Sequence, residues 1–558
     1  MRDTDDYDYG LRGGLLGNLN LWHMMVALLV AVLGLSLYAI VQFRGVQSPA
    51  AMEQATIARQ LAEGDGFTTQ VIRPFDLWLL DMPLDEVPES VPALWQAPFY
   101  PRVLAQVLRL TRCSQAFSAN GIMQAESRVM IPLGIACIIL ITLFSWLLAR
   151  NLLEDRVAHL AAAVLLLSPV TLQIMLSGGS LALGMLLSVV SFYLCWKAID
   201  HSFREHAVWL VFLFSAVAAL SAGLLFLTHY AAVLLVIGML FWLILNLQRM
   251  RWPAAVMFGA IALGVILLGL RGQTDGGWWG IAAYPYGALL DTTIFPGDML
   301  LRDGDSPLRS WQILQAVRDG IASRYLAFFT GRSMVSGGVI LVFFVVGLFG
   351  REERYWNQQA KWIAALILLL LPALPPVVGC SYGHWPIMFP LVVIFGTQAF
   401  YRILDQEEFF DIGARPILVS FLIVLCVMPS ALALVRRNAH SPYPPYYGPL
   451  QEYVTQWVPA DHTLLTDIPW ATAWYGRQPS LLWPRSVDQI VQYGDTVGGI
   501  YLAERRDRIA MAEDAWQYMR MDGVVPETLP FRTGLFLPAG QREQVLLLRE
   551  IDDAASDE

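Results

Sequence analysis

Long apolar runs recur along this chain and constrain its fold more than any other feature. An α-helix needs about 20 apolar residues to cross the hydrocarbon core of a bilayer. Such runs lie approximately at residues 20–43, 129–149, 156–175, 179–199, 207–226, 228–247, 253–271, 334–350, 358–379, 384–404 and 415–437. The pattern predicts a polytopic α-helical membrane protein with about eleven transmembrane helices.

The composition agrees with this class. Hydrophobic residues make up 56% of the 558 residues and charged residues only 15%, whereas roughly a quarter of the residues in a soluble domain are charged. The net charge of −9 comes mostly from acids outside the apolar runs, so we expect no nucleic-acid partner. The first run, Leu21–Phe43, is longer than the apolar part of a secretion signal, which predicts a retained first helix.

Positive charges predict the orientation, because loops on the cytoplasmic side are enriched in Lys and Arg. With residues 1–19 in the cytoplasm, every short loop on that side is basic. The residues concerned are Arg150, Arg156, Lys197, Arg204, Arg249, Arg251, Arg351, Arg354, Lys361, Arg402 and Arg415. An error of one span would invert the later loops and break the pattern. We therefore expect a cytoplasmic N-terminus and an extracytoplasmic C-terminal region.

Three long segments are predicted outside. Residues 44–128 and 272–333 are loops of a transmembrane domain at 20–437, and residues 438–558 follow its last span. The first loop contains helix-like stretches at Ala51–Ala62 and Arg102–Leu110. The last segment alternates short apolar runs, such as Thr463–Thr466 and Gln544–Leu548, with helical stretches. That alternation is typical of a small α/β domain.

The second outside loop is rich in aromatic residues, among them Trp278, Trp279, Tyr284 and Tyr286. These rings could stack on a sugar. An aromatic belt at the membrane interface is the alternative interpretation.

Cysteine and histidine spacing gives no sign of a metal centre. The five cysteines form no C-x-x-C, and the eight histidines have no ligand spacing such as H-E-x-x-H. Cys113 and Cys380 both fall in predicted outside segments and could form a disulfide, which the sequence alone does not decide.

Two motifs in the first outside loop resemble a known family. Glu53–Phe67 reads EQATIARQLAEGDGF, and Gln96–Pro101 reads QAPFYP. They are similar to the A-R-N-L-x-x-G-x-G-[FY] and H-x-P-L-Y-P stretches of the GT-C glycosyltransferases, the group with the protein O-mannosyltransferases and the aminoarabinose transferase of lipid A. Further similarities follow in the family order at Ala161–Pro169, Gly223–Val236, Gly383–Pro390 and Thr466–Gly476.

The resemblance implies a membrane enzyme of the bacterial cytoplasmic membrane. Such an enzyme moves a sugar from a polyprenyl-phosphate donor, held among the membrane lipids, to a glycan or protein acceptor on the outside face. A first-loop carboxylate acts as base or positions the acceptor, with or without a divalent cation, and arginines hold the lipid phosphate. The architecture suits this chemistry, because the donor is reached from the membrane and the acceptor from water.

The chain departs from the family where its catalytic acids stand. Aligned on Ala58 and Arg59, the family's acidic pair falls on Ala50 and Ala51. Glu53 lies about one helical turn further along, on roughly the same face, and could replace the missing acids. A solvated glutamate near a helix N-terminus is the alternative.

The expected phosphate contacts are also altered. Arg73 follows the first loop helix and could meet the phosphate, or form an ion pair with Asp76 or Asp81. His384 stands where many members have arginine, and with an ordinary pKa of about 6.5 it is a cation only when protonated. A hydrogen-bonded ring at the interface is its alternative role. The loop before the fourth span, Leu176–Ser180, has no carboxylate where many members carry one.

Two functions follow from these observations. The first is glycosyl transfer, with Glu53 as the base and Arg73 and His384 as phosphate contacts. The second is a GT-C fold without catalysis that serves as a structural or assembly subunit of a membrane complex, because Ala50 and Ala51 replace the acids. A transporter is the least expected class, since few ionisable residues fall within the predicted spans.

Overall fold

The computed structural model describes residues 21–46, 48–83, 85–94, 96–113, 124–203, 208–248, 250–271, 332–351, 355–370, 385–406, 414–435, 447–484, 487–503, 519, 525, 529–539 and 542–549. The chain divides into two units, Met1–Phe43 and Arg44–Glu558. The first unit contains α1 (Leu21–Gln42), which is long and apolar enough to cross a membrane.

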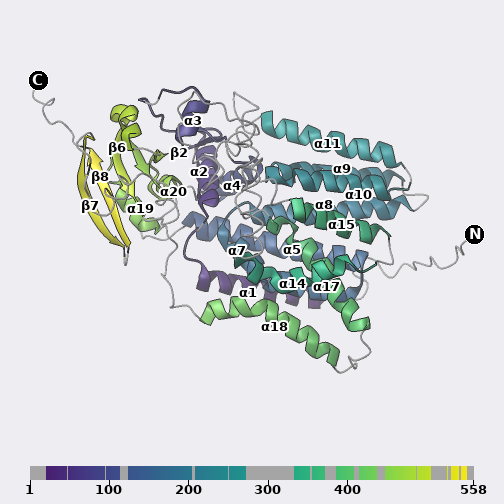
Figure 1. Ribbon diagram of the computed structural model, residues 1–558. Helices are drawn as coiled ribbons and strands as arrows, with labels where there is room; N and C mark the ends of the chain where they lie inside the picture. The colour runs from purple at the N-terminus through teal and green to yellow at the C-terminus, as the bar shows by residue number, and fades with distance from the viewer. Residues whose placement is uncertain are drawn as a thin grey trace, which may run out of the picture. The chain divides into compact units, whose positions relative to one another are not determined.

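The apolar runs of the second unit form helices. These are α5 (Ile131–Leu152), α6 (Asp155–Leu167), α7 (Pro169–Ser177), α8 (Leu181–Ser202), α9 (Val208–Phe226), α10 (Val233–Asn246), α11 (Arg251–Arg271), α14 (Arg332–Leu348), α15 (Tyr355–Leu370), α17 (Phe389–Gln406) and α18 (Ala414–Val435). Helices α8 to α11 pack side by side (Figure 1). Every predicted span overlaps a helix, which confirms the polytopic helical class.

The number of spans stays a prediction. Among the described residues, seven helices are long and apolar enough to cross a membrane, or eight if the pair α6 and α7 is one span. This pair bends by 48° at Ser168. The bend has a local cause, because Pro169 begins α7 and cannot continue the hydrogen bonds of α6, while the Ser168 side chain accepts the Val170 N–H.

Loops that the charge pattern predicts on one side of the membrane lie together. Arg156, at the start of α6, forms an ion pair of 2.6 Å with Asp405 near the end of α17, and Arg415 of α18 lies 3.3 Å from the same carboxylate. Asn357 of α15 donates to the carbonyl oxygen of Leu152 at the end of α5. This arrangement agrees with the predicted alternation of the helices. That this side is the cytoplasmic one stays a prediction.

The first loop contacts the opposite ends of the helices. At the start of its helix α4 (Phe99–Thr111), the Phe99 N–H donates to the carbonyl oxygen of Leu227 at 2.9 Å. The Tyr100 hydroxyl donates to the carbonyl oxygen of Gly178, between α7 and α8, at 2.6 Å. The described residues of this loop thus contact the end of the bundle that we predict to be outside.

Both predicted helical stretches of this loop are confirmed. Helix α2 (Pro49–Glu63) begins at a proline, whose fixed φ suits the first turn. It ends at Gly64, whose φ of 109° is a left-handed conformation that favours glycine. Helix α4 packs against α2, and Arg109 of α4 donates to the carbonyl oxygen of Ala62 in the last turn of α2.

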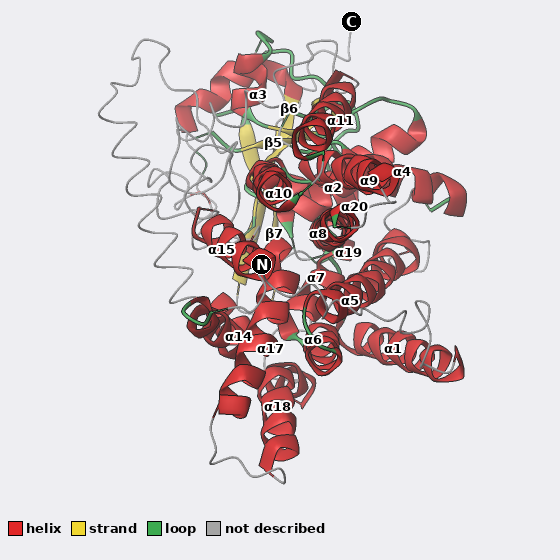
Figure 2. Ribbon diagram, turned by 90° about the vertical axis from the view of Figure 1, so that its right-hand side faces the viewer, coloured by secondary structure: helices red, strands yellow, loops and turns green. Residues whose placement is uncertain are grey.

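The C-terminal segment forms a sheet that the first loop completes (yellow in Figure 2). Strands β4 (Thr463–Thr466), β5 (Ser480–Leu482), β6 (Val497–Leu502), β7 (Phe531–Ala539) and β8 (Arg542–Arg549) join β2 (Val71–Ile72) in the order β2-β5-β4-β6-β8-β7. Strands β2, β5, β4 and β6 are parallel to one another. Strand β8 runs antiparallel to both of its neighbours, β6 and β7. The predicted strand positions in this segment are confirmed, but β2 was not predicted because two residues carry no periodicity.

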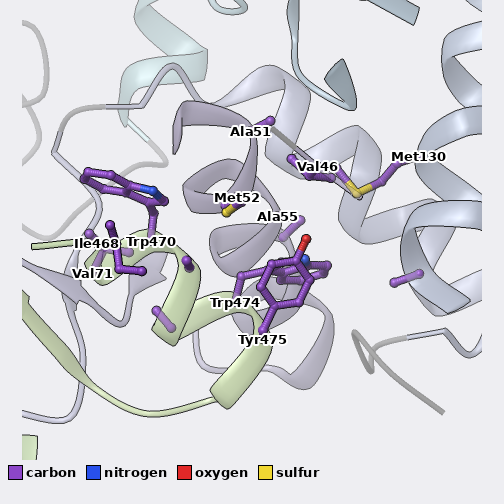
Figure 3. Packing of buried hydrophobic residues seen from close by; sticks show 14 of the residues in the cluster. Val46, Ala51, Met52, Ala55, Val71, Met130, Ile468, Trp470, Trp474 and Tyr475 are labelled. Atoms are coloured by element: carbon purple, nitrogen blue, oxygen red, sulfur yellow. The ribbon is translucent and has the colours of Figure 1, made fainter. Parts of the chain in front are cut away.

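An apolar seam joins α2 to α20 (Pro469–Gly476), the helix that follows β4 (Figure 3). Met52 and Ala55 of α2 are completely buried in the same cluster as Trp470 and Trp474 of α20. Completely burying an aromatic or methionine side chain contributes roughly 1.5–3 kcal/mol. The first loop and the C-terminal sheet therefore form one packed body.

Arg59 of α2 crosses this seam and is 1% exposed. Its guanidinium donates to the carbonyl oxygens of Ala473 and Trp474, at 2.8 and 2.9 Å, in the last turn of α20. A cation is favourable there because the C-terminal end of a helix carries partial negative charge. Burial lowers the pKa of Arg59 to about 10. The arginine of the family-like A-R motif is thus a structural clamp in this chain.

Candidate functional site

Glu53 and Arg73, the two described residues of the predicted site, are direct partners. The Arg73 guanidinium donates to both carboxylate oxygens of Glu53, at 2.9 and 2.8 Å, in a bidentate ion pair. Glu53 is 4% exposed and Arg73 8%, so Glu53 is not solvated. Bidentate pairing of this kind is the strongest geometry for an Arg–carboxylate contact. The sequence predicted both residues but not their contact with each other.

The local sequence fixes the position of Arg73. It follows β2, the edge strand of the parallel sheet, and immediately precedes α3 (Pro74–Leu79). Pro74 begins that helix, and Asp76 in its first turn accepts the Arg73 N–H at 3.1 Å, in the manner of an N-terminal capping contact. The Asp76 carboxylate also lies 3.8 Å from the Arg73 guanidinium, so the predicted ion pair with Asp76 is confirmed.

A chain of amides extends the site from Glu53 to the start of α8. Gln96 Nε2 donates to Glu53 Oε2 at 3.0 Å, and Gln54 Nε2 donates to Gln96 Oε1 at 3.0 Å. Gln54 Nε2 also donates to Ser180 Oγ at 3.0 Å, and Gln54 Oε1 accepts the Ser180 N–H at 3.2 Å. Sequence analysis missed these residues. The available signal was Gln96, a polar side chain at the histidine position of the family's H-x-P-L-Y-P stretch.

Small residues fill the place of one missing family acid. Ala51 is 1% exposed, and a Cβ added to Gly179 would lie 3.3 Å from the Ala51 Cβ. Gly179 belongs to the loop between α7 and α8, which has no carboxylate in this chain. Ala51, where the resemblance places one of the family's acids, therefore lies close to this loop.

A second buried carboxylate joins the bundle to α20. Glu126, in the π-helical turn η1 (Glu126–Met130) before α5, accepts the Trp474 Nε1–H at 3.0 Å and the Tyr475 hydroxyl at 2.8 Å. Burial and the Glu126 carboxylate raise the pKa of Tyr475 well above its ordinary value. These contacts hold α20, and with it the sheet edge that carries Arg73. The only sequence signal was an acid just before an apolar run.

The other predicted site residues lie outside the described residues. They are His384, Trp278, Trp279, Tyr284 and Tyr286. Cys380 lies outside them too, and Cys113 is a buried free thiol. The roles predicted for these residues stay predictions.

The side chains around Glu53 do not fit a divalent cation. Both carboxylate oxygens already accept from Arg73, and a metal ion would have to displace that cation. Among the residues that the structure describes, no group of three or more His, Cys, Asp or Glu side chains could hold a metal ion. We therefore assign no chemical step to a metal.

Comparison with known proteins agrees with the motifs. Residues 116–269 match the family described as dolichyl-phosphate-mannose-protein mannosyltransferase. No curated protein matches the chain by sequence.

Solved structures share the fold at low identity. ArnT from Cupriavidus metallidurans in the apo state has a TM-score of 0.54 at 11% identity, covering 95% of this chain and 98% of that one. The same protein bound to undecaprenyl phosphate has a TM-score of 0.52 at 10% identity, covering 96% and 99%. The archaeal oligosaccharyltransferase AglB from Archaeoglobus fulgidus, in complex with an inhibitory peptide and a dolichol-phosphate, has a TM-score of 0.53 at 9% identity, covering 86% and 70%.

The similarity to ArnT extends over nearly the whole of both chains. The match to the mannosyltransferase family covers the segment from before η1 to the end of α11. This chain therefore has the fold of these solved structures, and its residues 116–269 match the mannosyltransferase family, in agreement with the resemblance of its first-loop motifs.

Proposed function

We propose that this chain is a membrane glycosyltransferase that moves a sugar from a polyprenyl-phosphate donor to a glycan or protein acceptor. The buried Glu53–Arg73 pair supports this proposal most directly. Removing two charges from water costs several kcal/mol per ion, and an apolar pair would stabilise the same contact between α2 and β2 at least as well. Buried charges in a loop of this fold are therefore candidates for chemistry.

The two side chains have complementary roles in the proposed reaction. Glu53 accepts the proton of the acceptor hydroxyl as that oxygen attacks the anomeric carbon of the sugar. The bond between that carbon and the phosphate oxygen breaks, and its electron pair leaves with the polyprenyl phosphate. Arg73 binds the phosphate and stabilises its charge. Carboxylate and phosphate compete for the same guanidinium fork, so phosphate binding at Arg73 releases Glu53 for proton transfer.

The proposed location follows from the same geometry. The site lies where the first loop covers one end of the helix bundle. The Arg156–Asp405 pair, which joins two of the loops predicted to be cytoplasmic, lies at the opposite end. We propose that the site faces the extracytoplasmic side of a bacterial cytoplasmic membrane. A lipid donor then enters from the bilayer and the acceptor from water.

Complementation tests the proposed activity. A strain of the source organism that lacks this protein is supplied with the wild type, E53Q or E63Q, and envelope glycans and glycoproteins are compared by mass spectrometry. Glu63 is the matched control, since it lies on the same helix in an exposed pair with Arg477. We expect the wild type and E63Q to restore a sugar modification that E53Q does not restore, at equal protein levels.

A non-catalytic subunit is the second candidate. The contact between Ala51 and Gly179 favours it, because it closes the place where the family's acids stand. In that case E53Q would restore the envelope as well as the wild type does. The protein would also purify in a stable complex, and loss of the chain would reduce the amount of its partners in the membrane.

A further inference from the structure

We propose that Gln54 and Gln96 are positioning residues that present an N–H donor, and never an acceptor, to the Glu53 carboxylate. This inference rests on the proposed role of Glu53 and deepens it. The two glutamines link Glu53 to the backbone at the start of α8 through hydrogen bonds of 3.0 to 3.2 Å.

The Ser180 N–H sets the direction of these hydrogen bonds. A backbone N–H can only donate, so the N–H of Ser180 requires the amide oxygen of Gln54. The Gln54 NH₂ group must then face Gln96 and donate to its oxygen. With its oxygen occupied in this way, Gln96 turns its own NH₂ group to Glu53. The backbone donor of Ser180 thus fixes the orientation of both side-chain amides in this series of hydrogen bonds, which we call the relay.

The burial of Gln54 makes this orientation strict. Gln54 is 5% exposed, and a buried amide that pointed the wrong way would leave a donor against a donor at Ser180. Gln96, which donates to Glu53, is half-buried. An ionised carboxylate accepts hydrogen bonds and cannot donate. A donor from Gln96 therefore matches the ionised form of Glu53, which is the form that a general base requires.

Two ionisable groups near Glu53 belong to the described part of the chain. They are its direct partner Arg73, before α3, and Asp76 of α3, which contacts Arg73. The segment around Gln96 and the start of α8 contribute amides and a hydroxyl. Arg73 thus supplies the charged donor to Glu53, and Gln96 supplies a neutral donor to the same carboxylate.

The test reads the protonation of Glu53 directly and needs no substrate. Infrared difference spectra of the purified full-length protein in nanodiscs are recorded during an acid titration, and the Glu53 band is the carboxyl signal that E53Q lacks. In Q54E the new carboxylate still accepts the Ser180 N–H but cannot donate to Gln96. Gln96 then turns its oxygen to Glu53. We expect the Glu53 midpoint to rise by about one pH unit, the size of one charge-assisted hydrogen bond.

A double-mutant cycle separates orientation from simple charge repulsion. In the Q96M background no amide remains to be turned, so Q54E should add less than about a third of its single-variant shift. Q96H should keep the wild-type midpoint, because a neutral imidazole offers one donor and one acceptor. Q96M alone should raise the midpoint, which keeps the test available if Q54E does not fold.

Three results would overturn the inference. They are an unchanged midpoint in Q96M, an equal shift from Q54E with and without Gln96, or a shift in Q96H as large as in Q96M. The proposed function fails separately, if E53Q restores the envelope modification. If the Glu53 midpoint shifts as expected in the Gln54 and Gln96 variants but E53Q is fully active, the enzyme role is rejected and the relay is not.

Discussion

Replacing Arg73 by methionine tests whether the Glu53–Arg73 pair is as deeply buried as the structure shows. The Arg73 side chain is 9% exposed and the Glu53 side chain 5%, so solvent screens their interaction little. Removing one partner of a buried pair leaves an uncompensated charge, which typically costs about 3–5 kcal/mol. R477M is the matched control, because it removes an arginine from a pair with Glu63 that is 44% and 38% exposed. Exposed pairs of this kind contribute about 0–1 kcal/mol.

Unfolding of the purified protein in detergent, followed by tryptophan fluorescence, gives the comparison. We expect R73M to lower the unfolding free energy of the body that contains α2 and the sheet by about 3–5 kcal/mol, and R477M by less than about 1 kcal/mol. The double variant E53M/R73M should recover part of this loss, because the Glu53 carboxylate is no longer buried without its partner, whereas the Asp76 carboxylate still lacks the nearby guanidinium. Equal effects of R73M and R477M, or a double variant no more stable than R73M, would refute the reasoning.

Three further predictions concern Tyr501, Gly178 and Arg59. Burial raises the pKa of Tyr501 above its ordinary value of 10.0. The stability contributed by its neutral hydroxyl is therefore present below pH 10 and is lost as the pH rises further. Y501F should reduce this loss of thermal stability at alkaline pH. G178A should lower the unfolding free energy by about 1–2 kcal/mol, because Gly178 has a φ of 66° and an added Cβ would lie 2.8 Å from Met130 Cε. R59M should cost about 3 kcal/mol in chemical unfolding, since the carbonyl oxygens of α20 lose a buried cationic donor; a cost under about 0.5 kcal/mol would contradict the assigned clamp.

The helices were predictable from sequence because the bilayer demands long apolar runs. Helices α2 and α4 of the first loop were predictable too, from the helix-like stretches Ala51–Ala62 and Arg102–Leu110, whereas the short helix α3 was not. Strand β2 was not, because its two residues belong to the sheet only through pairing with β5, some 400 residues further along the chain. The joint body of first loop and C-terminal sheet is therefore a tertiary property that local patterns do not encode.

The candidate site was predictable in its residues but not in its contacts. Glu53 was predictable because it lies close to the positions of the family's acids, on roughly the same helix face. Arg73 was predictable because it follows the first loop helix. Their mutual pairing depends on β2 joining the sheet, which positions Arg73 over α2. The packing of Ala51 against Gly179 likewise brings together two segments that are far apart in sequence.

Sugar transfer by the purified protein is the most direct measurement of the central claim. The full-length wild type and E53Q are incubated with a lipid extract of the strain that lacks the protein, as donor source, and with its envelope glycans and proteins as acceptors. Mass spectrometry then counts the polyprenyl phosphate released. We predict release by the wild type and about a hundredfold or more slower release by E53Q, at equal thermal stability. Equal release by two equally stable proteins would contradict the assignment of Glu53 as the base.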